Sequence, residues 1–177
     1  YFKHIHDYMI AQKIDKYDLF IPTLPHLKNK ILKLTNNWKI KILVSDDIIK
    51  NENLYKKVFA SVTCSGTASL EISKRMIPQI IIYKLNFITF FLFSFLVKIK
   101  FANILNIFNN KMIITEVVNN NLNRNNLLKA FNQLIHDKSF REKQISNVKK
   151  SIVEIDSNSN PYEVCEERII KIISKAI

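Results

Sequence analysis

The chain has 177 residues, 47% of them hydrophobic, and 27 Lys+Arg against 15 Asp+Glu give it a formal net charge of +12. This length and apolar content predict a single domain, residues 1–177, with its own core. Nucleic acid is not expected as a partner, because the lysines are scattered and lack the interleaved aromatic residues of a base-stacking surface. Two distant cysteines, Cys64 and Cys165, exclude a disulfide framework and indicate a reducing, cytoplasmic compartment. The four histidines have no partners at ligand spacing, so no metal is expected.

The apolar residues alternate between the helical and the strand period along the first half of the chain. We expect helices over 1–14, 26–34, 51–60 and 67–76, and strands over 19–24, 39–45, 61–64 and 79–85. Such alternation predicts an α/β fold with a doubly wound parallel sheet, because parallel strands need helices on both faces. From residue 116 onward the pattern is helical, and the last segment, 162–176, is amphipathic. Because the chain begins at Tyr1 inside a periodic stretch, we expect a longer protein of which the start is missing.

The most apolar stretch is LNFITFFLFSFLV, residues 85–97, with lysines at its borders. It is shorter than the roughly 20 residues that a membrane-crossing helix needs. Two interpretations remain: a buried helix, which we favour, or a face that meets lipid while the lysines pair with anionic headgroups.

The chain contains one glycine, Gly66, in the sequence TCSGTASLE. It falls between a predicted strand and a predicted helix, at the carboxyl end of a strand, where open α/β sheets bind ligands. A glycine there lets an anion approach the backbone, and the helix that follows offers unpaired N–H groups. Ser65 and Thr67 carry hydroxyls that can cap the helix or bind phosphate, and Glu71 lies on the face of Thr67, where a carboxylate can accept ribose hydroxyls. A plain turn glycine, a helix cap and a first-turn charge explain the same residues, so spacing alone leaves the choice open.

Four blocks in this order and spacing, CSGTASLE, PQIIIYK, TFFLFSFLVK and NIF, resemble the carboxyl-terminal half of the lipid-A-disaccharide synthases. The resemblance implies the UDP-sugar-binding, Rossmann-like half of an inverting glycosyltransferase of the GT-B type, with a helical carboxyl-terminal segment. It implies a UDP-sugar site formed by seven residues: Ser65, Gly66, Thr67, Glu71, Lys84, Asn106 and Glu116. Among the departures from the family pattern, Leu105 and Thr115 replace prolines, and Asn109-Asn110 replaces an Ala-Gly pair.

The resemblance also implies a reaction and its partners. The enzyme would transfer 2,3-diacylglucosamine from its UDP donor to 2,3-diacylglucosamine 1-phosphate, giving lipid A disaccharide 1-phosphate and UDP, with no cofactor and no metal. It would act at the cytoplasmic surface of the inner membrane of a Gram-negative bacterium. The domain with the catalytic residue and the acceptor site has no match in this chain, so we expect the fragment alone to be inactive. A second copy or a separate amino-terminal half is the expected protein partner.

Two alternatives accompany this prediction. A UDP-N-acetylglucosamine 2-epimerase of the same fold carries a double glycine and paired glutamates at this turn, which Ser69-Leu70-Glu71 lacks. A basic, membrane-associated remnant without catalysis would keep the fold and lose the activity. The dinucleotide-binding fingerprint is excluded, because it needs three glycines.

Overall fold

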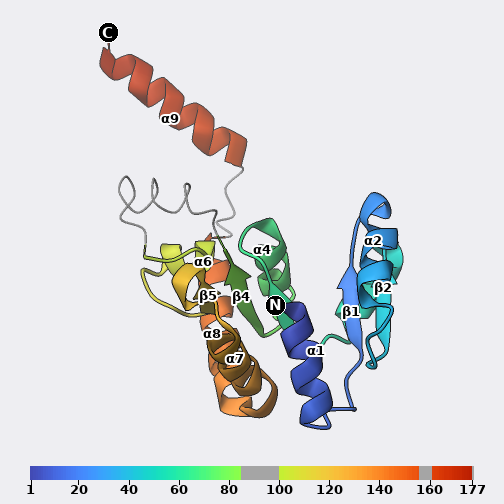
Figure 1. Ribbon diagram of the computed structural model, residues 1–177. Coiled ribbons are helices and arrows are strands. Elements are labelled where there is room, and N and C mark those ends of the chain that lie inside the picture. The colour runs from blue at the N-terminus through green and yellow to red at the C-terminus, as the bar shows by residue number, and fades with distance from the viewer. Residues whose placement is uncertain (85–99, 156–160, 177) are drawn as a thin grey trace.

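The computed structural model describes residues 1–84, 100–155 and 161–176, so the apolar stretch 85–97 lies outside the described residues (Figure 1). The strands in this part of the chain are all parallel and belong to two separate sheets. One sheet pairs β1 (Leu19–Pro22) with β2 (Ile42–Ser45), and the other has the order β3 (Ser61–Thr63), β4 (Gln79–Tyr83), β5 (Thr115–Val118).

Helices cover both faces of the three-stranded sheet. Ile80 and Ile82 of β4 pack in one cluster with α1 (Phe2–Ala11) and α7 (Arg124–His136). Ile81, which points to the other side, packs with residues within or next to α4 (Thr67–Lys74) and within α6 (Ile104–Phe108) and α8 (Lys138–Ile155). The three isoleucines are nearly inaccessible to solvent, as expected for a parallel strand covered on both faces. The predicted doubly wound α/β class is therefore confirmed.

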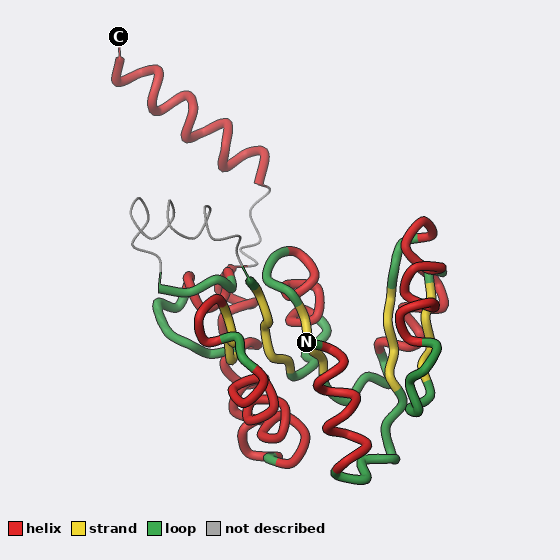
Figure 2. The backbone as a smooth tube through the Cα atoms, in the orientation of Figure 1, coloured by secondary structure: helices red, strands yellow, loops and turns green. Residues whose placement is uncertain are grey.

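The two-stranded sheet, with α2 (Pro25–Thr35) and α3 (Ile48–Tyr55), is packed much less completely. Residues 15–71, all of which the structure describes, contain no buried hydrophobic side chain. Ile48 and Ile49 at the start of α3 are each 79% exposed. Figure 2 shows this unit standing beside the rest of the molecule.

Two aromatic contacts join the β1–β2 unit to the rest of the chain. Trp38 stacks on His6 of α1 with ring centroids 4.8 Å apart, and the backbone N–H of Lys39 donates to Nε2 of His6 at 3.0 Å. Tyr17, just before β1, stacks on Phe59, just before β3, also at 4.8 Å. The first contact holds the segment before β2 against α1, and the second holds the amino ends of β1 and β3 near each other.

Turns in this chain are built almost without glycine. In the described part of the chain, four other residues adopt a positive φ, namely Lys13 (52°), Met76 (54°), Asn110 (45°) and Asn119 (50°). Asparagine tolerates this region better than most residues, which explains how Asn110 can stand where the family pattern has glycine.

One prediction of secondary structure was wrong, and one short helix was missed. Residues 116–118, expected to begin a helical region, belong to β5, whose strand forms because Thr115–Val118 pairs in register with Ile80–Tyr83. The short helix α6 was not predicted, and it begins where the Asn103 side chain caps the backbone N–H of Leu105 at 2.9 Å. Most of the described residues after β5 are helical as predicted, and α9 (Pro161–Ala176) extends away from the rest of the molecule in Figure 1.

Candidate functional site

The turn after β3 is held in a conformation that only glycine adopts readily. Gly66 has φ 121° and ψ −156°, and it is the N-cap of α4. A Cβ atom built on Gly66 would meet no atom within 4 Å. The glycine is therefore required by its backbone angles, and the space in front of it is open.

The start of α4 has no side-chain cap. The first helical bond is donated by the N–H of Leu70 to the carbonyl of Gly66, at 3.4 Å. Thr67 and Ala68, the first two residues of α4, are exposed at the positive end of the helix dipole, whereas Ser69 is buried. The interpretation of Ser65 or Thr67 as a cap was wrong, because the Ser65 hydroxyl instead donates to the carbonyl of Ala102 at 2.5 Å.

A buried polar network holds the turn from behind. The Ser69 hydroxyl donates to the Gly66 carbonyl at 2.7 Å and accepts from Nδ2 of Asn103 at 3.0 Å. Nε2 of Gln79 donates to the carbonyl of Ser69 at 2.9 Å, and the Gln79 backbone exchanges two hydrogen bonds, of 2.7 and 2.9 Å, with the side chain of Gln144 on α8. The turn is thus fixed to the middle of the sheet and to the helix behind it.

Glu116 of β5 holds the segment that packs against this turn. Its two carboxylate oxygens accept from the backbone N–H groups of Ala102 and Asn103, both at 2.8 Å, and from Nδ2 of Asn106 at 2.7 Å. Ala102 is the residue whose carbonyl receives the Ser65 hydroxyl. Glu116 therefore acts on the turn through the position of residues 102 and 103.

Asn106 is fully buried and makes contacts only with the protein interior. Its Nδ2 also donates to the carbonyl of Ile114 at 2.7 Å, and its Oδ1 accepts from the N–H groups of Ile113 and Ile114 at 2.8 and 2.9 Å. Both atoms of the amide are therefore engaged in joining α6 to β5.

Lys84 and Glu71 lie in more open positions. Lys84 directly follows β4 and is exposed, at the same sheet edge as Gly66 because β3 and β4 are parallel with Thr63 opposite Ile81. Within the described residues, its side chain makes no recorded hydrogen bond or ion pair. The Glu71 side chain is 62% exposed on α4, with Oε2 4.0 Å from Nη1 of Arg75.

Comparison with known proteins identifies the family. A family model described as lipid-A-disaccharide synthetase matches residues 6–169. The chain belongs to the lipid-A-disaccharide synthetase family.

Curated relatives of this family are longer than the chain. The lipid-A-disaccharide synthase of Rhodospirillum centenum is 18% identical over 170 residues, which cover 96% of this chain and 42% of the relative. Those of Rickettsia conorii and Rickettsia prowazekii are 29% and 31% identical, and the matched segments cover 73% and 70% of this chain but 28% and 33% of the relatives. The chain thus spans less than half the length of these synthases.

The seven residues that the family resemblance implies fall into three groups according to their place in the structure. Ser65, Gly66 and Thr67 form the turn, and Glu116 and Asn106 support it through residues 102–106. Lys84 lies at the same carboxyl end of the sheet as the turn, whereas the side chain of Glu71 points to Arg75. Sequence reasoning missed the supporting side chains Ser69, Gln79, Asn103 and Gln144, because they meet across up to 65 positions of sequence and no local pattern marks them.

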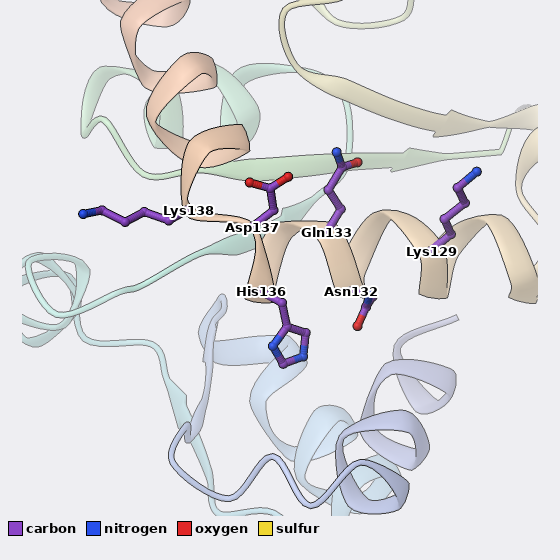
Figure 3. A pocket seen from close by; sticks show the side chains of 6 residues that line it. All are labelled: Lys129, Asn132, Gln133, His136, Asp137 and Lys138. Atoms are coloured by element: carbon purple, nitrogen blue, oxygen red, sulfur yellow. The ribbon is translucent and has the colours of Figure 1, made fainter.

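A hollow in the described part of this synthetase chain lies away from this turn. It has a volume of about 610 Å³ and lies at the end of α7, between Lys129 and Lys138. Figure 3 shows His136 and Asn132 pointing to one side of the helix, and Gln133 and Asp137 to the other, so their polar groups do not converge. Because α7 runs back along the sheet, this end is opposite to the Gly66 edge, and we do not assign the hollow to the site.

Two pKa shifts occur in the described part of the chain, and both fall near the β1–β2 unit. Nζ of Lys28 donates to Oδ1 of Asp46 at 2.6 Å, and this bond holds the pKa of that carboxyl below its ordinary value. Burial raises the pKa of the Tyr55 phenol, and the Arg75 guanidinium above its ring opposes that rise.

In the described residues, no helix combines the length and the apolar character that a bilayer crossing requires.

Proposed function

We propose that this chain is the UDP-sugar-binding half of a lipid A disaccharide synthase, and that the donor diphosphate lies against the turn Ser65–Thr67. The observation that carries the proposal is Gly66 itself, with glycine-only backbone angles, open space before it and an uncapped helix behind it. An anion placed there would receive the first N–H groups of α4 and the favourable end of the helix dipole.

The other implied residues take different roles in this proposal. Lys84 provides a positive charge at the same edge, and Glu71 turns from Arg75 to accept the ribose hydroxyls of the nucleotide. Rotation of this side chain is feasible, because it is mostly exposed and its distance of 4.0 Å from Arg75 is too long for a hydrogen bond. Asn106 and Glu116 are positioning residues, which keep residues 102–106 against the turn.

The proposed reaction transfers 2,3-diacylglucosamine from UDP to 2,3-diacylglucosamine 1-phosphate, releasing UDP and lipid A disaccharide 1-phosphate. The N–H groups of α4 and Lys84 would stabilise the charge that develops on the departing diphosphate. The catalytic base and the acceptor site would lie in the rest of the protein, at the cytoplasmic surface of the inner membrane, so this chain alone would bind the nucleotide without transferring sugar.

The direct test is calorimetric titration of the chain with UDP and with UMP. Tighter binding of UDP is expected, because UMP lacks the second phosphate that would meet the helix start. Circular dichroism under the same conditions verifies that the chain is folded. Equal affinities, or no binding of either nucleotide to a folded chain, would contradict the assignment of the turn to a diphosphate.

A further inference from the structure

The two sheets present unpaired edges to each other. Among the strands that the structure describes, β1 pairs only with β2, and β3 pairs only with β4, so each is an edge strand of its own sheet. The stacked rings of Tyr17 and Phe59 hold the amino ends of these two strands together. We call this region, residues 19–21 and 61–63, the β1–β3 junction.

Helices cover the β1–β3 junction on both sides. Leu19 of β1 and Val62 of β3 pack against the same core cluster as Ile5 and Met9 of α1. On the other side, Phe20 of β1 packs edge-on against Tyr55 of α3, and Tyr55 lies under the guanidinium of Arg75, at the end of α4. All six junction residues are nevertheless only half-buried, unlike the fully covered β4.

The order of the strands indicates what would complete the junction. A common doubly wound sheet has the order 3-2-1-4-5-6, numbered along the chain. If β1 to β5 are strands 2 to 6, the two observed sheets, β2-β1 and β3-β4-β5, reproduce this order with strand 1 between them. A helix that connects strands 1 and 2 would be required, and α1 precedes β1 with its amino end between the two sheets in Figures 1 and 2.

We infer that the β1–β3 junction accepts one further parallel strand, which enters from the amino side of α1 and joins the two sheets into one. The relatives supply a source for such a strand, because the matched segment of the Rhodospirillum centenum protein is only 42% of its length. The strand is apolar, because helices cover both of its faces. A right-handed strand–helix–strand connection through α1 places it beside β1.

The backbone of the junction identifies the atoms that this strand would engage. Leu19 and Thr23 donate their N–H groups to β2, and Ser61 donates to Pro78 next to β4. Since successive residues of a strand alternate in direction, the N–H groups of Phe20 and Val62 point to the opposite side, toward the junction. Pro22 has no N–H, so the new ladder on β1 relies on Phe20.

The test adds a strand to the chain and measures amide hydrogen exchange. Six alternating valine and isoleucine residues, followed by a four-residue serine and asparagine linker, are fused before Tyr1. The matched control has proline at the third and fourth strand positions, because proline cannot donate to a ladder and these two positions face opposite neighbours. If the apolar extension is insoluble, a version with threonine in place of valine keeps the strand preference.

Exchange of both the Phe20 and Val62 amides should slow by at least about tenfold in the extended chain and not in the proline control. The amides of Leu19 and Ser61, which already have acceptors, should change less. Protection at only one of the two strands would mean addition to a single sheet edge and would overturn the inference. Unchanged exchange in a folded extended chain, or equal protection in the proline control, would also overturn it. The measurement requires no nucleotide, so its outcome is independent of the proposed function.

Discussion

The two sheets of this protein differ in how well their side chains are buried and hydrogen-bonded. The three-stranded sheet has fully buried isoleucines on both faces and a polar network that extends from Gln144 to Gly66. The β1–β2 unit has no buried hydrophobic side chain. Two of its buried polar residues, Ser45 and Asn51, share a single long hydrogen bond of 3.3 Å. The candidate site therefore lies on the well-packed sheet, whereas the β1–β2 unit is the one for which we infer a further strand.

Two buried asparagines provide the largest expected contrast. Asn106→Ala should lower the free energy of unfolding by about 3–5 kcal/mol, because it leaves the buried amides of Ile113 and Ile114 without an acceptor and removes one of the hydrogen bonds to the Glu116 carboxylate. Asn51→Ala should cost less than about 1 kcal/mol, because Asn51 Oδ1 is buried without a partner in the described structure. Urea denaturation of both variants gives the comparison. Equal losses of unfolding free energy in the two variants would show that the buried polar groups of both units are hydrogen-bonded equally well.

Gly66→Val should abolish UDP binding. A β-branched side chain would fill the open space before the turn, and the glycine-only angles should cost about 1–3 kcal/mol of stability. Lys13→Val is the matched control, since Lys13 also has a positive φ, 52°, but lies at the end of α1. A folded Gly66→Val chain with normal UDP affinity would restrict Gly66 to a role in the turn.

Glu71→Gln should weaken UDP by roughly ten- to hundredfold, because it removes a charge-assisted hydrogen bond to the ribose. Affinity for inorganic pyrophosphate, which has no ribose, should stay nearly constant. Glu142→Gln is the control, since the Glu142 side chain is 67% exposed, close to the 62% of Glu71, and also forms an i,i+4 pair, with Lys138 on α8. Equal weakening of both ligands would assign Glu71 to the phosphate turn, and unchanged affinity for both would exclude a ligand role.

The smallest effect is expected at Asp46 in the β1–β2 unit. Its pKa is held below the ordinary value of 3.8 by Lys28, so the pair stabilises the fold above that pH and the contribution is lost as the pH falls through the lowered pKa. Lys28→Met should move the pKa of Asp46 upward, as measured by carboxyl NMR titration, and leave UDP binding unchanged. Lys41→Met, which removes the exposed partner of Asp18, should not move it. An unchanged midpoint in Lys28→Met would contradict the role of the pair.

The sequence was sufficient for the fold class and for the turn. The helices and the first four strands follow periodicities of 3.6 and 2 that residues near in sequence establish, and Gly66 stood out as the only glycine. β5 was missed because its four residues include Glu116 and become a strand by pairing with β4, a contact between distant segments. Periodicity within a segment does not show which strands pair with each other. It could therefore not show that the predicted sheet is divided between β1 and β3.

Only the exposed residues of the candidate site could be predicted from the sequence. The exposed residues of the turn form one short stretch, which a sequence pattern can mark. The residues that hold it come from β4, β5, α8 and the segment before α6, and their hydrogen bonds join amides and hydroxyls without a fixed spacing. Asn106 and Glu116 came from the resemblance, and the structure adds that they bind each other and the backbone.

The stacking of Trp38 on His6 gives the protein an intrinsic optical reporter at the boundary of its two units. Trp38 is the only tryptophan in the chain, and it lies between α2 and β2, whereas His6 belongs to α1. Indole emission responds to contact with a stacked ring and to water, so separation of the β1–β2 unit from α1 would change the fluorescence of a single residue. Opening of this boundary can therefore be followed in the unlabelled chain, at nanomolar to micromolar concentrations and on the timescale of mixing.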